Sequence, residues 1–179
     1  MINTKYIKCV LILTLVFCGL ILPNDLPAFS AKVIGIMDGD TIEVLHNGSP
    51  LRVRLYGIDT PERRQDFGAT AKQFTSERVG RRFVEIVPVE HDKYERMVAK
   101  VYVNGKYLNL MLVEAGLAWW YARYAPNDQA LAKAEQLARE SKVGLWSHPN
   151  PVAPWLYRRA KVSKHSNRPT EPVARELGH

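Results

Sequence analysis

The sequence predicts a small domain of the α+β class that is mostly β, with five strands closed into a Greek-key barrel and about three helices beside it. Two observations favour this fold. Five short β-rich segments, several of them alternating between apolar and polar residues, are separated by Asp-Gly, Asn-Gly and proline turns. Helical spacing is confined to the stretches between and after these segments. A chain of 179 residues, 46% hydrophobic, has room for one such domain.

The strand and helix candidates follow one another along the chain. The predicted strands are 32–36, 41–45, 51–56, 83–89 and 97–103. The predicted helices are 68–82, 109–115 and 126–142. Asn47-Gly48 favours a hairpin turn because both residues accept a positive φ, and Gly116 suits the C-terminal cap of the second helix. Five short strands with interspersed helices are typical of a barrel of the OB type.

The first thirty residues have the composition of a secretory signal. Lys5 and Lys8 precede an uncharged apolar run at 9–22, and Ala28 and Ser30 are small residues at the positions that a signal peptidase reads. The run is shorter than the roughly 20 residues of a membrane-spanning helix. We therefore expect residues 1–30 to be a cleaved signal and the protein to be secreted or extracytoplasmic. The rival interpretation is an uncleaved membrane anchor through residues 9–22.

Composition divides the rest of the chain into three parts. They are an OB-fold domain over 31–146, an ordered strap over 147–160 and a basic, disordered tail over 161–179. Cys9 and Cys18 both lie in the predicted signal, so the mature domain is expected to have no disulfide and no thiolate site. The formal net charge of the whole chain is +7, which favours a polyanionic partner such as a nucleic acid.

Two aspartates offer a site for a hard cation. Asp40 and Asp59 each lie beside a turn at the end of a predicted strand, where their side chains can face one cleft. Together with an oxygen of Thr41 or Thr60 they would suit Ca²⁺, which takes about 6–8 oxygen ligands in irregular geometry. The alternative is that Asp40 belongs to a solvated turn and Asp59 to a helix entry.

Glu62, Arg54 and Arg96 would supply the other groups that phosphodiester hydrolysis needs. Glu62 lies three residues beyond Asp59 and is a candidate general base for a water beside the cation. Its alternative role is to cap the following helix. Arg54 and Arg96 are candidates to bind a phosphate through paired N–H groups and to stabilise its developing charge. The alternative for either arginine is an ordinary surface position on a strand.

Further residues could contact the rest of a nucleic acid. Lys93 and Tyr94, next to Arg96, are placed to contact a terminal phosphate or a sugar. The aromatic run at 119–124 offers faces on which bases can stack, with core packing as the alternative for at least one Trp. The five histidines are scattered along the chain, so hydrolysis by a histidine pair or triad is not expected.

Three motifs stand in a fixed order: Asp-Gly-Asp-Thr at 38–41, Arg-x4-Asp-Thr-Pro-Glu at 54–62 and Asp-Lys-Tyr-x-Arg at 92–96. In this order they resemble the staphylococcal nuclease (thermonuclease) family of OB-fold enzymes. The likeness extends from about residue 31 to 146. It implies a calcium-dependent, sugar-non-specific endonuclease that hydrolyses DNA and RNA and leaves 3′-phosphorylated products.

The resemblance also implies roles for particular residues, and three departures from the family pattern. The implied roles are calcium ligands Asp40, Asp59 and Thr60 (through its carbonyl), general base Glu62, phosphate-binding Arg54 and Arg96, and nucleotide-contacting Lys93, Tyr94 and Tyr124. Glu95 replaces the glycine that usually precedes the second arginine, and could either pair with Arg96 or restrict the loop. The loop at 63–67 is shorter than in the staphylococcal enzyme, and Ala122 replaces a tyrosine that flanks the base.

The expected partners are DNA and RNA, with single strands preferred, and no stable protein partner is implied because the barrel is complete in a monomer. The alternative function is a non-catalytic nuclease-like OB-fold module that binds single-stranded nucleic acid or protein. Such modules normally lose some of the acids or arginines, whereas this chain has all six catalytic positions filled.

Overall fold

Five strands form a closed barrel in the computed structural model, which describes residues 27–166. They are β1 Phe29–Ile36, β2 Thr41–His46, β3 Ser49–Leu55, β5 Phe83–His91 and β6 Met97–Val103. The antiparallel neighbours follow the order β3-β2-β1-β5-β6, and a parallel pairing of β3 with β6 closes the barrel. This closure gives the five-stranded Greek-key barrel of the OB type that the sequence predicts.

The barrel interior is apolar because inward positions alternate with outward ones along each strand. Val53 and Leu55 on β3 are buried, whereas Arg54 between them points outward. The same alternation buries a set of residues from all five strands, which includes Val33, Ile42, Val44, Val84, Ile86, Met97, Ala99 and Val101. The chemistry-bearing side chains of the strands are therefore on the outer face and at the strand ends.

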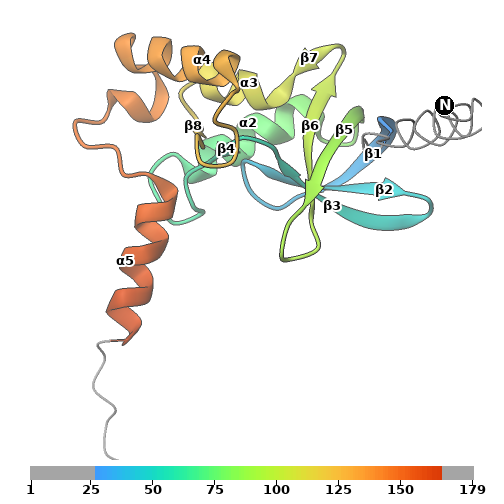
Figure 1. Cartoon of the computed structure of the whole chain (residues 1–179), viewed down its shortest axis with the longest axis horizontal. Coiled ribbons are helices and arrows are strands. Elements are labelled where there is room, and N and C mark those ends of the chain that lie inside the picture. Colours follow the sequence, from blue (N-terminus) through green and yellow to red (C-terminus); the bar gives the residue numbers. More distant parts are fainter. Residues whose placement is uncertain (1–26, 167–179) are drawn as a thin grey trace, which may run out of the picture.

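Four α-helices lie within the described residues, one more than the sequence predicts. They are α2 Gly68–Val79, α3 Leu108–Glu114, α4 Gln129–Glu140 and α5 Pro154–Ser166, with a short 3₁₀ helix, η1 Gly144–Ser147, before α5. Figure 1 shows α2, α3 and α4 grouped beside the barrel, while most of α5 extends away from it. Asp128 caps α4 by accepting a hydrogen bond from the amide of Leu131 at 3.1 Å.

The additional helix lies in the segment that the sequence assigns to a strap and a tail. Helix α5 begins at Pro154, which suits the first helical position because it needs no N–H donor there. The helix continues to Ser166, past residue 161 where the predicted tail begins. Residues 167–179 of that tail lie outside the described part of the chain.

The predicted N-terminal signal lies almost wholly outside the described residues, which begin at 27. Its predicted end at residue 30 falls inside β1, where Phe29 pairs with Ile86 and Ser30 with Glu85. Among the helices that the structure describes, none has the length and apolarity needed to cross a membrane.

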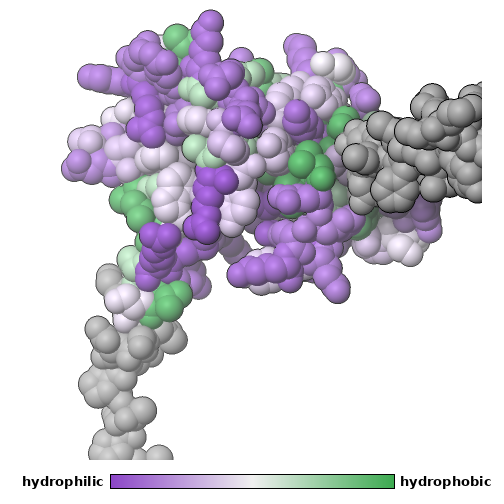
Figure 2. All heavy atoms as spheres, viewed as in Figure 1, coloured by the Kyte–Doolittle hydropathy of each residue, from purple (hydrophilic) through white to green (hydrophobic). Residues whose placement is uncertain are grey.

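Two short strand pairs attach the helices to the barrel. Strand β4 (Ile58–Asp59) pairs with β8 (Trp119–Trp120), so the segment after α3 lies against the chain that leaves β3. Strand β7 (Lys106–Tyr107) extends the β6 edge and leads directly into α3. Hydrophilic residues cover much of the face seen in Figure 2, over α4 and over the loop between β5 and β6.

Candidate active site

The turn between β1 and β2 holds Asp40 at the rim of the barrel. The carboxylate of Asp38 accepts a hydrogen bond from the amide of Asp40 at 3.1 Å. Thr75 of α2 donates its hydroxyl to the carbonyl of Gly39 at 2.6 Å. A Cβ on Gly39 would lie 2.7 Å from that of Ala71 and 2.8 Å from the hydroxyl of Thr60, so only glycine fits between α2 and the strand that follows β3. Asp40 is therefore fixed by both its own turn and α2.

Arg54 joins the two aspartates that the sequence singles out. Thr41 lies opposite Arg54 in the β2–β3 ladder, which places the guanidinium beside the neighbouring Asp40. One Nη group donates to Asp40 Oδ1 and the other donates to Asp59 Oδ1 at 2.8 Å. The amide of Thr60 donates to the second oxygen of Asp40 at 2.6 Å. The structure thus brings Asp40, Asp59, Thr60 and Arg54 into one cluster.

Both carboxylates are shielded from water, at 1% exposure each. Burial is the largest influence on Asp40 and raises its pKa to about 6, while Arg54 acts to lower it and Asp38 acts to raise it. For Arg54, burial acts to lower the pKa, but the two carboxylates outweigh it and the pKa rises. Asp40 is accordingly about half protonated near pH 6 and becomes a mostly ionised oxygen donor only as the pH rises above that value.

Glu62 lies beside this cluster and is more open to solvent. Its amide donates to the side-chain oxygen of Gln65 at 3.1 Å, which closes a turn after Pro61. Helix α2 begins only at Gly68, its N-cap is Phe67 and no acid lies in its first turn. The helix-capping alternative for Glu62 is therefore wrong. The carboxylate is instead free of the helix and points to the same arginine as Asp59.

That arginine is Arg158 of α5, a residue for which the sequence motifs predict no role. One Nη group donates to Asp59 Oδ2 at 2.8 Å, and the other donates to Glu62 Oε1 at 2.7 Å and to Asp59 Oδ1 at 3.3 Å. Pro154 followed by twelve residues without glycine or proline is a helix signal that could have identified α5. Glu62 and Asp59 precede Arg158 by 96 and 99 positions, and no local sequence pattern predicts contacts over such separations.

Arg96 lies in the loop between β5 and β6 and pairs with Asp92. Its Nε donates to Asp92 Oδ2 at 2.8 Å, and Asp92 Oδ1 accepts the amides of Tyr94 and Arg96. Burial alone would raise the pKa of Asp92, but these hydrogen bonds outweigh it and the pKa falls. In the parallel β3–β6 ladder Val53 lies opposite Met97, so Arg96 immediately precedes the strand that neighbours the one bearing Arg54. Its contacts are with its own loop rather than with Asp40 or Asp59.

Glu95 adopts a left-handed backbone conformation, with φ of 60°. This explains why a glycine suits the position, because a Cβ in this region costs about 1–2 kcal/mol. The partner of Arg96 is Asp92 at 2.6 Å, so the first alternative, pairing of Glu95 with Arg96, is wrong. The loop is held by the hydrogen bonds of Asp92, although Glu95 has a backbone conformation that only glycine adopts without strain.

Replacing Glu95 with glycine is expected to raise the free energy of unfolding by about 0.5–1 kcal/mol, because relief of the left-handed strain exceeds the greater chain entropy of glycine in the unfolded state. Urea denaturation measures this. The matched control is Glu85→Gly in the middle of β5, where the backbone is extended and glycine should lower stability by a similar amount. Equal destabilisation by both substitutions would show that Glu95 is not left-handed in solution.

The three residues expected near a nucleotide are all on the surface. Lys93 and Tyr94 share the loop of Arg96, and the Lys93 ammonium lies 5.0 Å from the Tyr94 ring centre. Tyr94 and Tyr124 are exposed. Tyr124 packs edge-on against Tyr121. The amide of Tyr121 donates to the carbonyl of Gly57 at 2.8 Å, so this segment lies beside the backbone two residues before Asp59.

The two tryptophans of the aromatic run serve mainly in packing. Trp119 contacts the rings of Trp146 and Trp155 edge-on, and the Trp120 indole donates to the carbonyl of Ala125 at 3.0 Å. Both are half-buried. The core-packing alternative thus holds for these residues, and Tyr124 is the ring of the run that remains open for a base.

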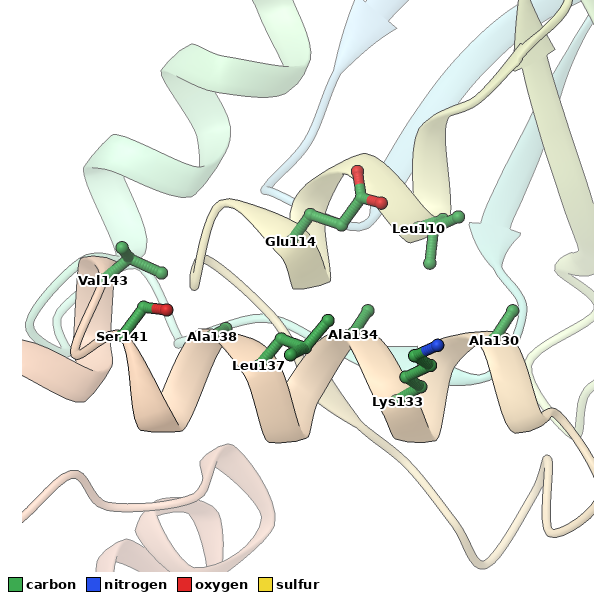
Figure 3. Close-up of a pocket in the computed structure, with 9 residues that line it drawn as sticks. All are labelled: Leu110, Glu114, Ala130, Lys133, Ala134, Leu137, Ala138, Ser141 and Val143. Carbon is green, nitrogen blue, oxygen red and sulfur yellow. The ribbon is translucent and has the colours of Figure 1, made fainter.

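Two hollows of the domain are lined by none of the expected site residues. A groove of about 500 Å³ between α3 and α4 is lined by Glu114, Lys133 and small or apolar side chains (Figure 3), and none of the expected site residues lines it. A cavity of about 270 Å³ lies between the loop at 61–67 and the segment leading into α5.

Within residues 27–166 no group of three His, Cys, Asp or Glu side chains is placed to hold a metal, so a cation at Asp40 and Asp59 would need backbone oxygens and water as well.

Comparison with known proteins identifies the family of this chain. The model of a family described as staphylococcal nuclease homologue matches residues 52–148, more than half of the chain. The chain belongs to the staphylococcal nuclease family. It is 37% identical to an "Uncharacterized endonuclease" of Escherichia coli O157:H7 over 88% of this chain and 99% of that protein. It is 39% identical to "Micrococcal nuclease" of Shigella flexneri over 74% of this chain and 82% of that protein.

The family extends to plants, where "Staphylococcal-like nuclease CAN1" of Arabidopsis thaliana is 37% identical over 62% of this chain and 34% of its own length. Membership makes this chain a nuclease of the endonuclease type, a hydrolase whose family is metal-dependent. The matched range contains Arg54, Asp59, Glu62 and Arg96. Arg158 lies beyond the range that the family model matches.

Proposed function

We propose that this nuclease is a calcium-dependent, sugar-non-specific endonuclease that hydrolyses DNA and RNA, single strands by preference, to 3′-phosphorylated products. The observation that supports this most is the pair of buried carboxylates, Asp40 and Asp59, held on one guanidinium with Glu62 beside them. The donors fit a hard cation because all are oxygens and both carboxylates converge on one point.

Asp40, Asp59 and the carbonyl of Thr60 would hold the calcium ion, which when bound supplies positive charge that polarises the scissile phosphate. Glu62 is the residue that takes the proton from the attacking water, since it is the solvent-reached carboxylate of the cluster. Arg54 has five N–H donors and uses three, on Asp40, Asp59 and the carbonyl of Ile58, so two remain for a phosphate oxygen. Arg96 is the second phosphate-binding group.

The exposed side chains account for the substrate class. Lys93, Tyr94 and Tyr124 present a charge and two ring faces, which bind a backbone and stack on any base without reading its edge. Strong salt dependence and little sequence specificity are expected, because most of the affinity would come from phosphate contacts.

The test is cleavage of single-stranded DNA and of RNA by the purified protein, with calcium and then with excess chelator. Glu62→Gln is expected to lower the rate by about 10²–10⁴-fold, the usual contribution of a general base. The matched control is Glu77→Gln, an exposed glutamate of α2 that accepts a hydrogen bond from Gln73 on the same helix. Removal of the product's terminal phosphate by a 3′-phosphatase checks the cleavage position. Full activity in chelator, or in Glu62→Gln, would contradict the proposal.

A further inference from the structure

The acid site is closed on its open side by a side chain from the C-terminal helix. Arg158 contacts both oxygens of Asp59 and one oxygen of Glu62, while Arg54 holds Asp59 from the barrel side. Both oxygens of Asp59 are therefore engaged by guanidinium groups. Burial alone would lower the pKa of Arg158, but its hydrogen bonds to Asp59 and Glu62 outweigh this and raise it, so the side chain is a permanent cation.

The start of α5 is anchored beside the site by four contacts. Gln65 donates to the carbonyl of Val152, and Tyr157 donates its hydroxyl to the carbonyl of Arg64 at 3.3 Å. The Trp155 ring stacks on Tyr121 with centroids 4.9 Å apart and planes 8° apart, and it also meets Trp119 edge-on. Figure 1 shows this end of α5 near the loop that follows β4, with the remaining turns extending away from the domain. Arg158 is thus delivered to the acids by a docked segment.

A divalent cation and Arg158 need the same oxygens. A cation bound by Asp59 requires a lone pair on an oxygen that now accepts from Arg158, and a positive guanidinium beside the ion would repel it. The side chain of Arg158 is 44% exposed, so it can exchange its carboxylate partners for water without unfolding the domain. The contact is therefore a reversible one in competition with the ion.

We propose that Arg158 is an internal counter-ion of the acid site, which neutralises Asp59 and Glu62 in the resting protein and lowers the affinity for the divalent cation until the cation displaces it. This rests on the proposed function in placing the cation at Asp59. The residue acts on the ion through the two carboxylates, as a positioning residue rather than a catalytic one. If the pair is formed nine-tenths of the time, the apparent Kd for the ion is about tenfold above that of the open site.

The test is calorimetric titration of calcium into the purified protein without nucleic acid. Arg158→Gln is expected to lower the apparent Kd by about tenfold. Arg158→Lys should lower it less, since lysine keeps the charge but cannot span Asp59 and Glu62 with a planar fork. The matched control is Arg159→Gln, the exposed neighbour on α5, which makes no ion pair within the described residues and should leave the Kd unchanged. Trp155→Ala is a second route, since loss of stacking on Tyr121 releases α5 and should also tighten binding.

The outcomes separate this inference from the proposed function. A Kd that is the same or higher in Arg158→Gln, while the wild type binds calcium and cleaves DNA, overturns the counter-ion role alone. An unchanged Kd with a lower kcat or a higher KM would instead assign Arg158 to the substrate. Absence of calcium binding in both the wild type and Arg158→Gln would overturn the cation site and the inference with it. Thermal unfolding of each variant confirms that the compared proteins are folded.

Discussion

Replacing Arg54 with lysine is expected to lower nuclease activity by about 10²–10³-fold, the usual cost of removing a preorganised donor from a charged transition state. The same substitution at Arg52 should change activity by less than about twofold, because exposed charges contribute little. Arg52 and Arg54 are on the same outer face of β3, but the Arg52 side chain is 64% exposed and lies 3.8 Å from Glu43. The comparison thus separates the effect of the position of Arg54 from the general effect of replacing an arginine on this face of β3.

The physical reason lies in the shape of the guanidinium. Its two Nη groups contact Asp40 and Asp59 at once, and both carboxylates are buried. A lysine ammonium is a point charge that cannot serve two acceptors and a phosphate with fixed geometry. One buried carboxylate would lose its partner and its charge would become unfavourable, so the pKa of Asp40, already raised to about 6 by burial, would rise further.

The measurement is kcat/KM on single-stranded DNA, with calcium affinity and urea denaturation followed in parallel. Loss of activity in Arg54→Lys with a folded protein and an active Arg52→Lys would support the role of the cluster. An active Arg54→Lys would show that positive charge near the aspartates suffices, and that simultaneous contact of one guanidinium with Asp40 and Asp59 is not needed. Loss of activity in both variants would show that any arginine on the outer face of β3 is needed, which would contradict a special role for Arg54.

The barrel and the aspartate pair could be predicted because their signals are local. Alternation along β3 places Arg54 outward between Val53 and Leu55, and the structure has this arrangement. Asn47-Gly48 predicts a hairpin, and both residues have the positive φ that such a turn requires, at 49° and 78°. In each case the prediction needs only neighbours in sequence or the pairing of adjacent strands.

The parts that the sequence did not predict depend on distant contacts. Residues 161–166, where the predicted tail begins, are mostly basic and polar, a composition shared by disordered tails and exposed helices, so composition alone could not separate the two. Helix α5 is fixed through Trp155 on Tyr121 and through Arg158 on the acids, and neither contact has a local signature. Similarly, Asp92 was part of a recognised motif, but its role as the partner of Arg96 appears only once the loop is folded.

The largest effect on stability is expected at Gly116, where an alanine should lower the free energy of unfolding by about 2–5 kcal/mol, the sum of left-handed strain and steric overlap. Gly116 has φ of 63° after α3, as its predicted C-cap role requires. A Cβ there would overlap the carbonyl of Val143, and that carbonyl belongs to backbone that cannot rotate away. Leu145 donates its amide to the Gly116 carbonyl at 2.8 Å, so the end of α3 and η1 are bonded at this point.

The matched control is Gly105→Ala, because Gly105 has a similar φ of 72° but open space within 4 Å of its Cβ position. It should lose only about 1 kcal/mol, from backbone strain alone. Urea denaturation gives the free energy of unfolding of both variants, and the difference between their losses is the contribution of steric overlap at Gly116. Equal losses would mean that the contact with Val143 relaxes freely. A much larger loss at Gly116 would show that the close approach of α3 and η1 is rigid. Trp146 of η1 packs against Trp119, which contacts Trp155 of α5, so that rigid junction would also support the position of Arg158.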